Sequence, residues 1–271
     1  MKVYLMTDLE GVAGVWDWDN RGEPNMPAYE EMLRSRRLLT GEVNAAMAGF
    51  FDGGATEVIV NDGHGAGYTI DIEDVDPRAR VIHGQERPFW LALLDETCAA
   101  TAIVGAHAKA CTDGANLCHT MSHTTVADYS VNGVSMGEIG LQALIAGHYG
   151  VPFIFLSGDE YACREVEELV PGVGTVATKA GLSRRSACTL APPEARIRIR
   201  QGARDAMGLI GTLEPLRLEQ PLVFRERRIQ PDVHPEAATG GWRRISEYER
   251  ELGAADVIEL MCLMYGYERP R

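Results

Sequence analysis

Short apolar runs alternate with longer amphipathic stretches over the first two thirds of the chain. A short apolar run that ends in a polar residue or glycine is typical of a buried strand, whereas apolar positions recurring every three or four residues are typical of a helix. The predicted strands are residues 3–8, 57–62, 79–84, 101–108 and 152–159, and the predicted helices are residues 28–53 and 137–148. This alternation predicts an α/β fold, a three-layer αβα arrangement with helices on both faces of a mainly parallel sheet.

The last third of the chain has a different pattern. It opens with a Pro-Pro pair followed by a helical, arginine-rich stretch. The elements predicted beyond it are an amphipathic or edge strand at 221–228, a loop at 230–242 and a closing helix at 244–264. We therefore expect a boundary near residue 192, between a larger α/β domain, residues 1–192, and a smaller C-terminal α+β domain, residues 193–271.

The chain as a whole is acidic. Its 271 residues carry 26 Lys and Arg against 39 Asp and Glu, which gives a formal net charge of -13. Nucleic acids and anionic membranes attract basic surfaces, so we expect neither as a partner, and the acidity also simply favours solubility. Asp8 and Glu10 interrupt the first apolar run too early for a signal peptide, and no run approaches the roughly 20 apolar residues of a spanning helix. These features predict a soluble, cytoplasmic protein.

The sequence lacks the motifs of several common catalytic and binding sites. The six cysteines are scattered and form no CxxC pair, which favours free thiols and argues against a zinc site made of thiolates. There is no GxSxG elbow, no phosphate-binding GxxxxGK[ST] loop and no HExxH helix. Cys118 adjoins His119, but neighbouring side chains of an extended loop usually point apart, so a cysteine nucleophile is disfavoured.

Polar side chains that can bind a metal follow three of the predicted strands. Asp8 and Glu10 follow the first strand, Asp62 and His64 the second, and His107 the fourth. Each alone is weak, because an aspartate at a strand end is often a turn residue and a lone histidine is often structural. Carboxyl ends of parallel strands meet at one edge, however, and two adjacent carboxylates require a cation or a proton between them. Carboxylates combined with imidazoles form a ligand set that zinc prefers.

Further candidates surround this set. Glu138 lies at the start of a predicted helix, where it is either a ligand or a first-turn acid favoured by the helix dipole. His119 and His123 lie on a loop, and either could be a ligand, a general acid or base, or neither. Asp62 could orient His64 or form a turn, and the two interpretations have equal weight. Of the remaining histidines, His83 and His148 are expected to have ordinary packing or surface roles, and His234, in the loop predicted at 230–242, carries no functional signal. The arginines Arg196, Arg198, Arg200 and Arg204 are expected to form a solvated helix face or a subunit contact rather than a carboxylate site.

Taken together, these motifs resemble the D-aminopeptidase family of zinc peptidases. The motifs that carry the resemblance are TDLEGVAG (7–14), EVIVNDGHG (57–65), GAHAKA (105–110), CHTMSH (118–123) and VNGVSMGEIGL (131–141). Further similarity lies in VPFIFLSGDE (151–160), EELVPGV (167–173) and SRRSA (183–187). The resemblance covers about residues 1–192 well and the C-terminal part poorly, and its motifs occur in the family's order.

The resemblance implies a specific site and activity. Two zinc ions per subunit are implied, and the metal ligands that match the family are Asp8, Glu10, His64, His107 and Glu138. Asp8 would bridge the two ions, and His119 would be the catalytic histidine, with His123 as its substitute. The implied reaction is the removal of N-terminal, D-configured residues from short peptides by a metal-bound hydroxide, in a homo-oligomeric ring such as a decamer. The alternatives are another dinuclear-metal amidase or hydrolase, and a non-catalytic ring-forming binding protein.

Overall fold

The computed structural model describes residues 1–19, 26–231 and 241–270, and its largest element is a mainly parallel sheet, sheet A. The strand order in sheet A is β3-β2-β1-β4-β7-β8-β9, and only β9 runs antiparallel to its neighbour. The strands are β1 (Lys2–Thr7), β2 (Glu57–Asp62), β3 (Ala79–Ile82), β4 (Ala100–Ala106), β7 (Phe153–Asp159), β8 (Gly174–Ser183) and β9 (Ser186–Thr189). The five predicted strands of this sheet begin and end within two residues of the observed ones.

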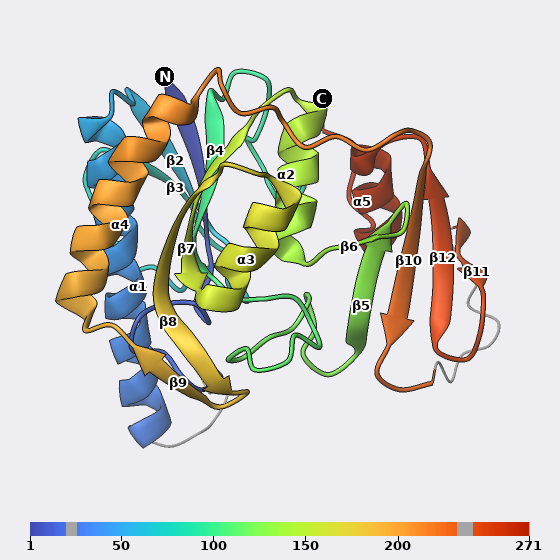
Figure 1. Ribbon diagram of the computed structural model, residues 1–271, viewed down its shortest axis with the longest axis horizontal. Helices are drawn as coiled ribbons and strands as arrows, with labels where there is room; N and C mark the ends of the chain where they lie inside the picture. The colour runs from blue at the N-terminus through green and yellow to red at the C-terminus, as the bar shows by residue number, and fades with distance from the viewer. Residues whose placement is uncertain (20–25, 232–240, 271) are drawn as a thin grey trace.

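Helices cover both faces of sheet A, which confirms the predicted three-layer αβα fold. α1 (Met26–Asp52) and α4 (Pro192–Ala206) lie side by side on one face, and α2 (Glu138–His148) and α3 (Glu160–Leu169) lie on the other (Figure 1). A short 3₁₀ helix, η1 (Met207–Leu209), follows α4. Each face buries its own apolar cluster, since strand residues alternate between the two sides.

A second, antiparallel sheet, sheet B, lies beside the αβα layers. Its strand order is β11-β12-β10-β5-β6, and α5 (Val257–Tyr265) packs against it (Figure 1). The strands are β5 (Val126–Val131), β6 (Val134–Ser135), β10 (Leu222–Arg228), β11 (Arg243–Arg244) and β12 (Glu249–Ala254). β10 alternates buried and exposed residues, as an amphipathic strand does, but it lies in the middle of the sheet rather than at an edge.

The predicted closing helix at 244–264 is wrong in its first half. Residues Glu249–Ala254 form β12, which pairs in register with β10, and only Val257–Tyr265 are helical. The sequence ERELGA has no strong preference for a strand, so pairing with β10 decides its conformation. The helix begins where Asp256 accepts a hydrogen bond from the backbone N–H of Glu259, a normal N-terminal cap.

The division of the chain at residue 192 stays a prediction. Sheet B takes β5 and β6 from before this position and β10 to β12 from after it. α4, which follows it, packs on α1 through buried residues such as Ile199 and Ala203. Most of the loop predicted at 230–242, with His234, lies outside the described residues. Within the described residues, no helix is long and apolar enough to cross a membrane.

Candidate metal centre

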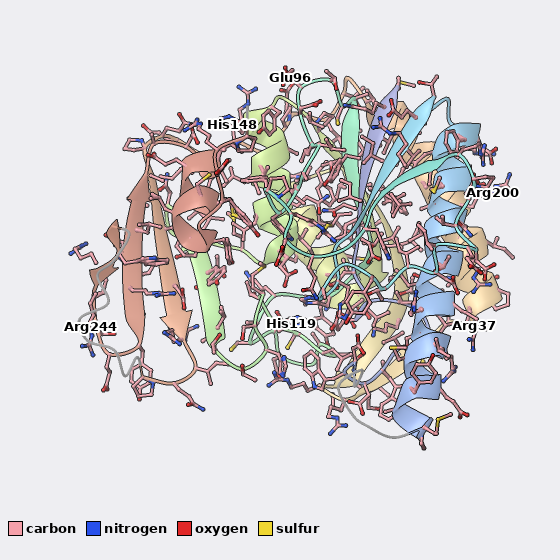
Figure 2. The ribbon with its side chains drawn as sticks, turned by 180° about the vertical axis from the view of Figure 1, so that it is seen from behind. Arg37, Glu96, His119, His148, Arg200 and Arg244 are labelled. Atoms are coloured by element: carbon pink, nitrogen blue, oxygen red, sulfur yellow. The ribbon has the colours of Figure 1, made fainter. Side chains whose placement is uncertain are left out.

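The carboxyl ends of three neighbouring strands bring the predicted ligands to one edge of sheet A. β1 lies between β2 and β4, and the three strands are parallel. Asp8 directly follows β1, His64 lies two residues after β2, and His107 directly follows β4. Residues distant in sequence therefore meet where ligands bind in open α/β sheets. His119, from the loop between β4 and β5, lies at this end of the molecule, opposite to His148 and Glu96 (Figure 2).

A close approach of two backbones places Asp8 beside His107. The N–H of Asp8 donates a 2.8 Å hydrogen bond to the carbonyl of Val104, and the N–H of Gly11 donates a 2.7 Å bond to that of Gly105. Gly105 has a φ of +79°, and a Cβ there would lie 2.0 Å from the carbonyl oxygen of Asp8. Only glycine fits this position, so the glycine of the GAHAKA motif is what allows β1 and β4 to meet so closely.

Asp8 lies at the centre of the cluster, and its two carboxylate oxygens face different histidines. Oδ1 lies 3.0 Å from Nδ1 of His64, and Oδ2 lies 3.1 Å from Nε2 of His107. Oε2 of Glu10 lies 3.0 Å from the same Nδ1 of His64, whereas Oε1 of Glu138 lies 3.6 Å from Nε2 of His107. The arrangement is two groups, each of two carboxylates and one imidazole, which share Asp8.

The donor atoms of this cluster fit metal ions. Asp8 and Glu10 are buried, and Oε2 of Glu10 accepts no hydrogen bond from any described residue. Within the described part of the chain, Asp8, Glu10 and Glu138 form ion pairs with histidines but with no lysine or arginine. Ligand atoms of Asp8, Glu10 and His107 all lie within 4.8 Å of one another. Buried carboxylates so close together require a cation or a proton between them, and mixed oxygen and nitrogen donors suit zinc.

Charges in the cluster shift the pKa values of its histidines in opposite directions. Burial disfavours a charged His64, but Glu10, Asp19 and Asp8 outweigh burial and raise its pKa well above the usual value. Likewise, Asp8 and Glu138 overcome burial and raise the pKa of His107. Burial and the neighbouring His107 lower the pKa of His119. Positive charge is therefore favoured where the carboxylates converge, while His119 favours its neutral form.

His119 lies directly against the cluster with one ring nitrogen open. Its ring stacks on that of His107, with centroids 3.8 Å apart and planes 14° apart. Nδ1 lies 2.9 Å from the carbonyl of Leu117, so Nδ1 carries the proton and Nε2 is the unprotonated nitrogen. The ring of His123 stacks on Trp18 instead, and its centroid lies 6.3 Å from that of His119. Of the two loop histidines, His119 is the one placed against the cluster.

The cluster opens into a cavity of about 680 Å³. Trp18, Trp90, Met121 and Tyr267 form apolar parts of its lining, next to His64, His119 and the carboxylates. Small-molecule sites have about this size and combine apolar walls with a few convergent polar groups.

Comparison with known proteins identifies the family. Residues 1–264 match the family described as D-aminopeptidase. A curated D-aminopeptidase from Bacillus subtilis (strain 168) is 37% identical over 199 residues, which is 72% of this chain and 69% of that protein. A solved structure of a zinc-dependent D-aminopeptidase from Bacillus subtilis, described as a self-compartmentalizing protease, superposes with a TM-score of 0.89 at 30% identity. That match covers 98% of this chain and 96% of the other.

The chain belongs to the D-aminopeptidase family. It is therefore an enzyme that hydrolyses peptide bonds, as its motifs predicted. These findings do not favour the alternatives of another dinuclear-metal hydrolase or a non-catalytic binding protein.

In this family member, the carboxylate of Asp62 forms no hydrogen bond or ion pair with His64. Its Oδ2 accepts hydrogen bonds from the backbone N–H groups of Thr69 and Ile70 at 2.8 and 2.9 Å, and it lies 3.1 Å from Nδ1 of His83. Asp62 thus closes the glycine-rich loop that carries His64. The carboxylate at the other nitrogen of His64 belongs to Asp19, whose Oδ2 lies 3.4 Å from Nε2. Asp19 was not predicted, because no motif or strand end in the sequence marks it.

Two buried charged residues outside the predicted set hold the ligand-bearing loops. Glu165 on α3 accepts hydrogen bonds from the backbone N–H groups of Lys109 and Gly137, at 2.8 and 3.0 Å, and so ties the residues after His107 to the start of α2. Lys179 on β8 donates to the backbone carbonyl of Glu10 and, at 2.7 Å, to that of Val15. Burial lowers the pKa of Lys179 to about 8.

The other residues singled out in the sequence lie away from the cluster. On α4, Arg198, Arg200 and Arg204 form exposed ion pairs with Glu194, Asp52 and Asp205. The thiol of Cys118 is buried and faces the carbonyl of Thr112 at 3.4 Å. These arginines and Cys118 therefore have structural roles and take no part in the cluster.

Proposed function

We propose that this enzyme binds two zinc ions at the cluster and removes D-configured N-terminal residues from short peptides. The observation that carries the proposal is the position of Asp8, whose two oxygens face two separate groups of ligands. Asp8, Glu10 and His64 would hold one ion, and Asp8, His107 and Glu138 the other. The D-configuration and the zinc follow the descriptions of the family and of the related proteins.

The two ligand histidines are oriented by their second nitrogens. Nδ1 of His107 lies 2.9 Å from the carbonyl of Ala108, which leaves Nε2 free to face Asp8. In His64 the roles are reversed, since Nδ1 faces the carboxylates and Nε2 lies near Asp19. Such partners fix the ring and raise the basicity of the ligand nitrogen. Glu138 is held in turn by the backbone N–H of Met121, at 2.7 Å.

The proposed mechanism assigns proton transfer to His119. When bound, two zinc ions acidify water and polarise the scissile carbonyl. Nε2 of His119 has the open lone pair and the lowered pKa of a neutral base, so it accepts a proton during attack and returns it to the leaving nitrogen. Trp18 packs edge-on against this ring at 5.3 Å and helps to hold it in place. The carboxylates of the cluster attract the positively charged amine of a peptide.

We also propose that the enzyme is cytoplasmic and assembles into a homo-oligomeric ring, with a decamer as the expected size. Free thiols at all six cysteines, which lie within the described residues, are typical of a reducing compartment. Large exposed apolar side chains, Trp16, Met26 and Tyr29, lie near the start of α1 and suit a subunit contact. Light scattering should give a mass ten times the 29.6 kDa of one chain.

The central test is zinc content together with peptide hydrolysis on the same preparation. We expect two zinc ions per chain and faster release of alanine from D-Ala-D-Ala than from L-Ala-L-Ala. His107→Ala should bind less zinc, whereas His148→Ala, an exposed histidine at the opposite end of the molecule, should bind as much as the unmodified enzyme. Absence of zinc after reconstitution, or hydrolysis of L-peptides alone, would contradict the proposal.

A further inference from the structure

Among the described aspartate, glutamate, lysine and arginine residues that line the cavity beside the cluster, all but one are acidic. The charged lining of the cavity includes the carboxylates of Asp8, Glu10, Asp19, Glu86 and Glu138. Among the described residues that line it, Arg87 is the only lysine or arginine. A short peptide with free ends carries an amine at one end and a carboxylate at the other. The amine is attracted to the acidic end of the cavity, whereas the carboxylate requires a cation.

Arg87 is held rigidly by neutral partners. Nε donates to the carbonyl of Gly84 at 3.1 Å, Nη1 to Oδ1 of Asn61 at 2.6 Å, and Nη2 to the carbonyl of Asp62. The amide of Asn61 is itself fixed, because its Nδ2 donates to the carbonyl of Trp90 at 3.1 Å. Arg87 forms no ion pair with any described residue, so its charge is not neutralised. A guanidinium has five N–H groups, and three partners leave two for a ligand.

The glycine-rich loop around His64 is shaped to accommodate this guanidinium. Gly67 has a φ of +71°, and a Cβ there would lie 1.9 Å from Nη2 of Arg87. The carbonyl of Gly67 also accepts a 2.5 Å hydrogen bond from the N–H of Gly84, which joins the loop to the segment that carries Arg87. Gly67 is therefore required for Arg87 to lie here, which accounts for a glycine that the metal ligands alone do not explain.

Arg87 lies in the same cavity as the metal-ligand candidates and is joined to the loop that carries one of them. Its Nη2 contacts the carbonyl of Asp62, two residues before the metal-ligand candidate His64. Two residues of chain span at most about 7 Å, so this contact ties Arg87 to the loop that carries His64. Arg87 and the metal-ligand candidates line the same cavity, and a dipeptide with its amine at the cluster can extend its carboxylate through this cavity towards Arg87.

We propose that Arg87 is a specificity residue that binds the terminal carboxylate of a dipeptide substrate, a role that rests on the proposed aminopeptidase function. An arginine fork binds a carboxylate through two parallel hydrogen bonds, and pre-organisation lowers the entropic cost of binding. The enzyme then prefers a free dipeptide to the same dipeptide with an amidated C-terminus.

The test compares kcat/KM for D-Ala-D-Ala and for its C-terminal amide. The unmodified enzyme should prefer the acid at least tenfold. Arg87→Gln should lower this acid-to-amide ratio by about ten- to a hundredfold, mainly through KM for the acid, because charge-assisted hydrogen bonds are lost. Arg87→Lys, which keeps the charge without the fork, should restore part of the ratio.

Arg36→Gln is the matched control. Arg36 also donates to a backbone carbonyl of this region, that of Ile70 at 3.2 Å, but it does not line the cavity. The Arg36→Gln variant should leave the acid-to-amide ratio unchanged. Zinc content should be measured for every variant. A ratio near one in the unmodified enzyme, or equal ratios in the Arg87 and Arg36 variants, would overturn the role of Arg87. Failure to cleave either substrate would instead overturn the proposed function.

Discussion

Buried acids are treated differently at the edge of sheet A and within sheet B. In sheet B, Glu226 is almost fully buried and is bound by Arg250, with Nη2 2.7 Å from Oε2. At the edge of sheet A, Asp8 and Glu10 are equally buried, but among the described residues they form ion pairs with histidines alone. A buried acid that is paired with a fixed guanidinium has a structural role. A cluster of buried acids without a guanidinium partner is suited to binding an exchangeable metal cation. The partner of a buried carboxylate therefore separates a structural role from a metal-binding role.

Removing the shared carboxylate should have the largest effect. Asp8→Asn keeps the size of the side chain but removes the charge that faces both histidines. We expect zinc content to fall below one ion per chain and kcat/KM to fall on the order of a thousandfold or more, since polarisation by both metals is lost. Elemental analysis and dipeptide assays measure both. Retention of two zinc ions per chain would contradict the metal-binding role of Asp8, which would then be a structural acid like Glu226.

His119→Ala should lower turnover with little effect on zinc. Its Nε2 faces no described carboxylate within ion-pairing distance, and its role is assigned to proton transfer, which contributes about 10²- to 10⁴-fold to a rate. We expect kcat to fall within this range while zinc stays near two ions per chain. A parallel loss of zinc would make His119 a ligand, since ligand atoms of His107, His119 and Glu138 lie within 4.8 Å of one another.

The ligand residues could be predicted from sequence because strand order places them together. Asp8, His64 and His107 each follow a buried apolar run, and neighbouring parallel strands necessarily bring their ends to one edge. Asp19 and Lys179 could not be predicted in this way. Asp19 lies outside any element, and Lys179 lies within β8, where its side chain reaches back to the carbonyl of Glu10. Such roles depend on tertiary packing, which leaves no local pattern.

The difference between local sequence patterns and tertiary packing also explains why the helix predicted at 244–264 is wrong in its first half. β12 is short and contains charged and small residues, so its sequence carries little preference for a strand, and β5, which comes before residue 192 but lies in the same sheet, is also short. Each becomes a strand because β10 pairs with it on either side. Periodicity predicts an element that buries its own apolar face, but it does not predict one whose conformation is fixed by a distant partner.

Glu42 offers an intermediate case, a buried acid with neither a paired arginine nor a place in the cluster. Oε1 accepts a 2.8 Å hydrogen bond from the N–H of Ala13, whereas Oε2 has no hydrogen-bond partner among the described residues. Burial raises its pKa from 4.5 to about 7. The folded state thus holds the proton more tightly than the unfolded state, so stability is highest below pH 4.5 and falls as pH rises through 7.

Glu42→Gln should remove this part of the pH dependence. Gln keeps the acceptor for Ala13 without a buried charge, so the variant should gain on the order of 3 kcal/mol in unfolding free energy at pH 8 relative to pH 4. Urea titrations of both proteins at these two pH values measure the gain. Parallel pH dependence in the two proteins would show that Glu42 is neutralised by its surroundings, as the acids of sheet B are.

The smallest effect is expected in sheet B. Arg250→Met removes the guanidinium from Glu226 while an unbranched side chain can still cover the ring of Trp242, over which Arg250 lies at 4.0 Å. We expect a loss of about 1–2 kcal/mol, below the cost of breaking a fully buried pair, because Arg250 is partly exposed and Arg228 still lies 3.9 Å from Glu226. Zinc content and kcat/KM should stay unchanged, since Glu226 already has a fixed arginine partner and takes no part in binding a metal ion. A fall in zinc content in this variant would show that the charge balance of the two sheets is coupled.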